Sequence, residues 1–190
     1  MALGMKRTLL SLIVVLMCSL GALAQVTMKT HLSLGVEYGL TTGSLSDFYG
    51  SVIGTSLKIE VPVGSPDFNL TGTIGYTAYL VRLDYNGPLV LNAEKFVPVE
   101  IGAKYYFTKI AYFEGDAGIS QNVQSNFTGS KSAFIYSPMI GISAPSNNHK
   151  STIDLGLRFE SRGDNHQVAV RAAYRFGPTF PKPDKPKRAK

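Results

Sequence analysis

Histidine, serine and cysteine are the side chains from which a catalytic or metal site could be built in this chain of 190 residues. The three histidines, His31, His149 and His166, lie far apart without metal-ligand spacing. His166 is expected to face outward at a strand end, but its own strand offers no serine at the neighbouring outward position. Ser161 could approach it only across strands. The sequence therefore disfavours an enzyme and predicts no catalytic, metal-binding or cofactor-binding residue.

Charged side chains form a second candidate site, because they share one face of a recurring pattern. In eight segments, apolar residues alternate with glycine, serine, threonine and charged residues, which is typical of strands with two unlike faces. The sixth segment is the least regular, because Ile135 and Met139 blur the contrast. The segments cover 32–40, 56–61, 68–80, 97–107, 111–120, 134–143, 153–160 and 167–176. The charged set is Glu37, Lys58, Glu60, Glu100, Lys104, Glu114, Asp116, Asp154, Arg158, Glu160, Arg171 and Arg175.

The uncharged face of these strands could point at a protein core or at lipid, and three features favour lipid. Short connections such as 64–67 alternate with long ones such as 81–94, as in outer-membrane barrels. Aromatic residues such as Tyr38 and Phe107 lie toward strand ends, where membrane and water meet. Runs of about ten residues match a tilted crossing of the bilayer. We therefore expect an all-β fold, an eight-stranded antiparallel up-and-down transmembrane β-barrel over residues 25–176.

The two ends of the chain differ from this middle part and carry all of the net charge of +6. Residues 1–24 combine a basic start, a short apolar run and an Ala22-Leu23-Ala24 cleavage site, which predicts a cleaved signal peptide. The only cysteine, Cys18, lies in this segment. Residues 177–190 are rich in proline and lysine, which predicts a disordered basic periplasmic tail. Because residues 25–176 are neutral, the basicity does not indicate nucleic-acid binding.

Three segments carry a family resemblance: FVPVEIGAKYYF at 96–107, YFEGDAG at 112–118 and VRAAYRF at 170–176. They resemble the outer-membrane protein β-barrel domain family, of the OmpX type. The resemblance implies a location in the outer membrane of a Gram-negative-type bacterium. It also implies that the aromatic end of the last strand, Tyr174 and Phe176, acts as a signal for the barrel-assembly machinery. In that family the terminal aromatic closes the chain, whereas fourteen residues follow Phe176 here.

A barrel of eight strands has an interior that side chains can fill, so an open channel is not expected. Buried charges are stable only when they are paired and hydrogen-bonded. The charged set therefore predicts a structural ion-pair network in the lumen, across the fourth, fifth, seventh and eighth segments. The functional alternative for the same residues is a narrow pore for ions or small solutes.

The sequence predicts a non-enzymatic integral outer-membrane protein whose partners are the surrounding lipid and an envelope protein or the cell wall. Contact would be made through the outer loops or the tail, because loops on a rigid scaffold often carry recognition. Arg162-Gly163-Asp164 matches a cell-adhesion tripeptide, but glycine and aspartate are ordinary turn residues. Two alternatives remain: a soluble periplasmic lipocalin-like barrel around an apolar ligand, and a lipid-modifying membrane enzyme.

Overall fold

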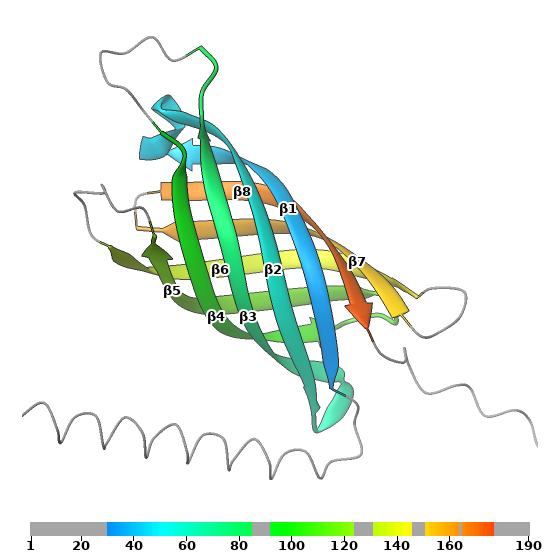
Figure 1. Ribbon diagram of the computed structural model, residues 1–190. Coiled ribbons are helices and arrows are strands. Elements are labelled where there is room, and N and C mark those ends of the chain that lie inside the picture. Colours follow the sequence, from blue (N-terminus) through cyan, green and yellow to red (C-terminus); the bar gives the residue numbers. More distant parts are fainter. Residues whose placement is uncertain (1–29, 85–91, 124–130, 146–150, 164, 177–190) are drawn as a thin grey trace, which may run out of the picture.

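The chain forms a closed barrel of eight antiparallel strands in the computed structural model, in which each strand pairs with the next (Figure 1). The structure describes residues 30–84, 92–123, 131–145, 151–163 and 165–176, so the predicted signal peptide and tail lie outside the described residues. The strands are β1 His31–Gly43, β2 Tyr49–Val63, β3 Ser65–Val81, β4 Glu94–Tyr106, β5 Ala111–Asn122, β6 Ser132–Pro145, β7 Ser151–Arg162 and β8 Asn165–Phe176. A 3-10 helix, η1 Ser44–Asp47, follows β1.

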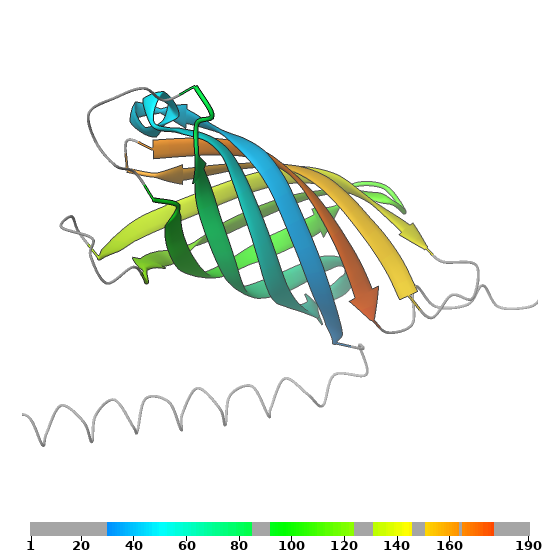
Figure 2. The same ribbon diagram turned by 45° about the horizontal axis from the view of Figure 1, so that its top comes forward.

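The first and last strands close the barrel. They pair without interruption from Leu32 opposite Phe176 to Gly43 opposite Asn165. In both views the start of β1 and the end of β8 lie side by side, at the rim opposite η1 (Figure 1 and Figure 2). Closure satisfies the backbone hydrogen bonds of both edge strands, which is a condition for a sheet inside hydrocarbon. We call the rim with both strand ends the inner rim and the rim with η1 the outer rim.

The predicted difference between the two rims is present where the structure describes them. At the inner rim a single residue, Gly64, joins β2 to β3, and its φ of 72° is one that glycine adopts readily. Gly163 has a φ of 58° at the outer rim, in the short turn between β7 and β8. At the outer rim, the β1–β2 connection, which contains η1, is longer, and so is the β3–β4 connection. Among the described residues, no helix has the length and apolarity needed to span a membrane.

Charged and apolar side chains occupy the two faces of the sheet in the opposite way to that of a soluble protein. Lys104 and Asp154 each expose 1% of their surface, whereas Ile101 exposes 75% and Val170 57%. Of the described charged residues within strands, only Asp67 and Lys95, at strand ends, are exposed. The apolar face is therefore outside and the charged face inside. This arrangement is the reverse of the soluble lipocalin-like alternative.

The strands differ from the expected segments mainly at the outer rim. β2 begins at Tyr49 and not at residue 56, because Val52 points inward and Ile53 outward, so two apolar residues hide the alternation there. Tyr49, which lies before the expected segment at 56–61, is buried in the lumen. Ile135 and Met139, the residues that blur the sixth segment, also face the lumen.

Candidate functional site

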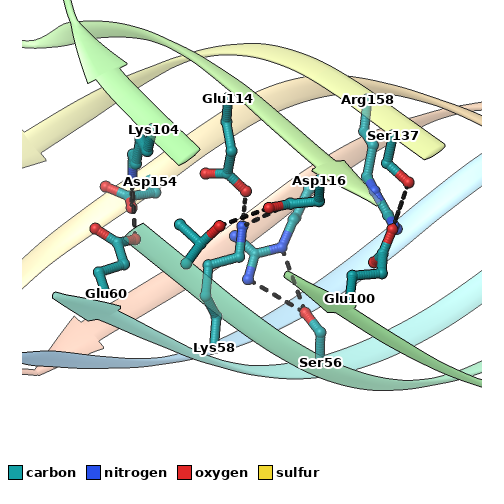
Figure 3. A network of polar contacts seen from close by, with 12 residues as sticks. Ser56, Lys58, Glu60, Glu100, Lys104, Glu114, Asp116, Ser137, Asp154 and Arg158 are labelled. Carbon is teal, nitrogen blue, oxygen red and sulfur yellow. Dashed lines mark hydrogen bonds and ion pairs between the residues drawn. The ribbon is translucent and has the colours of Figure 1, made fainter. Parts of the chain in front are cut away.

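The predicted charged set lies in the lumen, where it forms three groups of ion pairs. The first, the Lys104 group, consists of Glu60, Lys104, Asp154 and Arg175 from β2, β4, β7 and β8. Figure 3 shows Lys104 between Glu60 and Asp154. The Lys104 ammonium donates to Glu60 at 3.0 Å and to Asp154 at 2.9 Å. It also lies 4.0 Å from the centre of the Tyr112 ring. Each charge in this group is therefore compensated by groups on other strands.

The second group surrounds Arg158, and we call it the Arg158 group. The guanidinium contacts three carboxylates, at 2.9 Å to Glu37, 2.6 Å to Glu100 and 3.0 Å to Glu160. Ser137 accepts a further hydrogen bond from Arg158 and donates one to Glu100 (Figure 3). One cation thus balances acids from β1, β4 and β7. Its loss would leave three buried carboxylates without their main counter-charge.

The third group lies between the other two, and we call it the Lys58 group. Lys58 donates to Glu114 and lies 3.7 Å from Asp116, which accepts a hydrogen bond from Thr71 (Figure 3). Arg171 reaches Ser56 and lies 3.4 Å from Glu37 of the Arg158 group. The network therefore extends to β1 and β2, beyond the fourth, fifth, seventh and eighth segments for which it was expected. Its structural role remains a prediction.

Glycine makes space for these side chains at several positions of the inner face. At Gly141 a Cβ atom would lie 2.5 Å from the Tyr112 hydroxyl and 2.6 Å from the Leu155 carbonyl oxygen. Tyr112 is 1% exposed, so it has little room to move. The Tyr112 ring in turn lies beside Lys104. The close packing of the Lys104 group therefore depends on a residue without a side chain.

Replacing Gly141 with alanine should lower the free energy of unfolding by about 1–3 kcal/mol, the usual cost of overpacking a filled interior. Circular dichroism during urea unfolding in detergent micelles would measure it. Gly115→Ala is the matched control, because nothing lies within 4 Å of its Cβ position. Equal unfolding midpoints for the two variants would show that the lumen is loosely packed.

Arg162 adds a cation to the outer part of the lumen that the sequence did not predict as a lumen residue. Its guanidinium lies 3.8 Å from the Phe96 ring centre and 5.3 Å from that of Tyr79, and it donates to Glu160 at 3.0 Å. Tyr49 packs edge-on against Tyr79 at 6.4 Å. Arg162 was assigned to a turn, although it ends β7 and continues the inward positions of Arg158 and Glu160. These contacts fill the lumen near the outer rim.

Ser161 and His166 lie together on the outer face, close to the outer rim. They are paired across β7 and β8, and the Ser161 hydroxyl lies 2.9 Å from His166 Nδ1. The approach across strands that the sequence left open is therefore present. Ser161 is only 3% exposed, and none of the described residues that line the hollow beside this pair is a carboxylate. The pair resembles part of a catalytic triad, but among the described residues no acid contacts the histidine to orient it.

The other candidate residues stay apart in the described part of the chain. His31 begins β1 at the inner rim, His149 and Asp164 lie outside the described residues, and no group of three potential metal ligands occurs among those described. Tyr174 and Phe176 face outward at the inner rim, with ring centres 4.8 Å apart. Recognition of this strand end by the assembly machinery remains a prediction.

A closed barrel with an apolar outer face and an ion-paired lumen defines a transmembrane β-barrel. Aromatic pairs lie near both rims of the outer face, at Phe107 with Phe113 and at Tyr136 with Phe159. The chain has the fold of the small eight-stranded outer-membrane β-barrels of the OmpX type.

Two solved structures with TM-scores above 0.5 support this fold. Ail, the attachment invasion locus protein of Yersinia pestis, is 18% identical and has a TM-score of 0.51, with 78% of this chain and 99% of that chain covered. Neisserial surface protein A is 14% identical with a TM-score of 0.54, and 80% and 97% are covered. The outer membrane enzyme PagL is 13% identical with a TM-score of 0.46, and 76% and 98% are covered. No protein-family profile and no curated protein matches the sequence. At these identities the likeness concerns the fold alone.

Proposed function

We propose that this chain is a non-enzymatic integral protein of a Gram-negative-type outer membrane, which is exported through its signal peptide and binds a partner through its outer loops. The observation that carries the proposal is a clamp between the first two outer connections. Arg82, just after β3, donates to the Ser46 carbonyl in η1 at 3.1 Å, and its backbone N–H donates to the Phe48 carbonyl at 3.0 Å. The β1–β2 connection and the first residues after β3 are therefore held together as one surface, which we call the outer platform (residues 44–48 and 82–84).

The outer platform presents exposed apolar side chains. Leu83 is fully exposed, and Phe48 is 36% exposed. Arg82 also donates two hydrogen bonds of 2.9 Å to Asp84, and these bonds hold the pKa of the Asp84 carboxyl below its ordinary value. Asp84 is thus kept negative beside an exposed leucine. Pre-ordered loops bind partners at a lower entropic cost than flexible ones, which favours recognition as the role of this surface.

The lumen supports a binding role over a pore, and the outer face supports it over an enzyme. Three ion-paired groups and an aromatic cluster occupy the lumen, so a pore would need a large rearrangement of paired charges. The shielded Ser161 hydroxyl favours a structural or binding role for the Ser161–His166 pair over nucleophilic attack. Contact of the basic tail with the cell wall is a separate prediction and lies outside the described residues.

Photo-crosslinking in intact cells tests the proposed role. A benzophenone amino acid at Leu83 should give a discrete crosslinked product, whereas the same label at Lys109, exposed at the inner rim, should not give that product. Arg82→Ala should reduce the yield several-fold, because it removes the side-chain bond of the clamp to the Ser46 carbonyl and leaves only the backbone bond to Phe48. Lys95→Ala, which removes an exposed cation of the outer rim outside the platform, is the control. A yield at Leu83 that is insensitive to Arg82→Ala, or no product at all, would contradict a role for the platform.

Labelling of a single cysteine tests the orientation that this proposal requires. The predicted mature chain has no cysteine, because Cys18 lies in the signal peptide. Leu83→Cys should react with a membrane-impermeant maleimide in intact cells, and Lys109→Cys only after lysis. The reverse pattern would place the platform inside the cell envelope and exclude an outside partner.

A further inference from the structure

The outer face carries one hollow that combines aromatic walls with a polar pair. It has a volume of about 380 Å³ and is lined by Ala133, Phe134, Tyr136, Ser161, Gly163 and His166 from β6, β7, β8 and the turn between the last two. The turn residue Gly163 belongs to the outer rim. The hollow therefore opens toward the membrane at the depth where the outer leaflet changes from hydrocarbon to headgroups. We propose that it binds the ester-linked chain region of an outer-leaflet lipid.

The walls of the hollow are held in place before any lipid arrives. The His166 ring stacks on Phe159 with centres 5.6 Å apart and planes 29° apart, and Phe159 packs against Tyr136 at 6.4 Å. Ser161 pairs with Tyr136 on β6 and with His166 on β8, so the strand ladders fix all three backbones. An acyl chain could enter this hollow with little reordering of the protein, which keeps the cost of binding low.

The polar pair at its edge can recognise a hydrogen-bond acceptor. Where the Ser161 hydroxyl donates to His166 Nδ1, the proton of the neutral ring is on Nε2, which can donate to an outside acceptor. Where Nδ1 donates to the hydroxyl oxygen instead, only the shielded hydroxyl hydrogen would be left over. The donor for an outside group is therefore the Nε2–H of His166. The acceptors that a lipid offers at the boundary between its chains and its headgroup are ester carbonyl oxygens.

This site goes beyond the proposed function, because it concerns the membrane-facing side of β6, β7 and β8 and not the outer platform. It is also distinct from hydrolysis of the same ester. Nucleophilic attack would require the Ser161 oxygen to reach the carbonyl carbon, and that residue is 3% exposed. The ester is therefore bound through its oxygen and leaves unchanged.

Photoactivatable lipids that differ only in their linkage test the site. The full-length barrel is reconstituted in phosphatidylglycerol vesicles with a minor amount of diazirine-labelled phosphatidylethanolamine, with either ester-linked or ether-linked chains. Crosslinks to the β6 segment 132–145 are counted by mass spectrometry. The ester lipid should exceed the ether lipid about fivefold, the ratio that one hydrogen bond of ordinary strength gives.

Two variants connect this preference to the pair. The double variant Ser161→Ala/His166→Phe removes both donors and keeps an aromatic ring, so its ratio should fall to about one. Thr55→Val changes an exposed hydroxyl on the same outer face of β2, and its ratio should stay unchanged. A ratio of one in the unaltered protein, or a preference that persists in the double variant, would overturn the proposal. So would release of free fatty acid that Ser161→Ala abolishes, since the pair would then be a nucleophile and base.

Discussion

Replacing Arg158 with leucine should lower the free energy of unfolding by about 3–5 kcal/mol, which is the expected cost of removing one partner from a buried ion pair. The guanidinium lies within 3.0 Å of Glu160 and still closer to Glu37 and Glu100. Leucine would remove the cation that contacts Glu100 and, among the described residues, would leave Glu37 with only Arg171 at 3.4 Å and Glu160 with only Arg162 at 3.0 Å. Urea unfolding in detergent micelles, followed by circular dichroism, measures the change.

An exposed ion pair supplies the control for this experiment. Arg82 and Asp84 are 2.9 Å apart, but their side chains are 42% and 72% exposed. Arg82→Leu should therefore change the free energy of unfolding by only about 0–1 kcal/mol. If Arg158→Leu were as mild as this control, the lumen charges would be solvated, and the structural role proposed for the network would be wrong.

Replacing Leu157 with arginine should destabilise the barrel in lipid by about 2–4 kcal/mol, because the side chain lies on the outer face near the middle of β7. Leu157 is 53% exposed, and in a soluble protein such a surface substitution would usually change stability by only about 0.5 kcal/mol. The size of the effect thus depends on what surrounds the barrel. Urea-dependent folding into phospholipid vesicles measures it.

Leu83→Arg is the matched control, because Leu83 is exposed in the outer platform and not on the lipid-facing belt. It should leave the stability nearly unchanged. Substitutions on a water-exposed surface usually change stability by less than about 0.5 kcal/mol. A difference between the two variants within that range would indicate that Leu157 is in contact with water.

Much of the fold could be predicted from the sequence, because charged and apolar residues alternate along most strands and so indicate which face each residue occupies. Along β7, Asp154 and Arg158 alternate with Leu155 and Leu157, and the structure places the first pair inside and the second outside. Prediction failed where this contrast disappears. Val52 faces inward beside outward Ile53, so β2 is longer at its start than the pattern shows.

The contacts within the site could be predicted only in part, because alternation gives the face of a residue but not its depth in the barrel. Lys58 and Glu114 are 56 residues apart, and their meeting depends on the stagger of every strand pair between β2 and β5. The partners of Glu37 on β1 depend in the same way on closure between β1 and β8. Ser161 and His166 were easier to relate, since the short turn between their strands limits the possible register.

Spin labels on neighbouring positions of β7 and β8 test the orientation of the sheet most directly. In phospholipid vesicles, labels at Leu155 and Val170 should collide often with lipid-dissolved oxygen and rarely with a water-soluble nickel chelate. Labels at Asp154 and Arg171, in the same folded barrel, should be shielded from oxygen in the lipid. Shielding at Leu155 and Val170 together with free oxygen access at Asp154 and Arg171 would contradict a barrel whose apolar face meets the membrane.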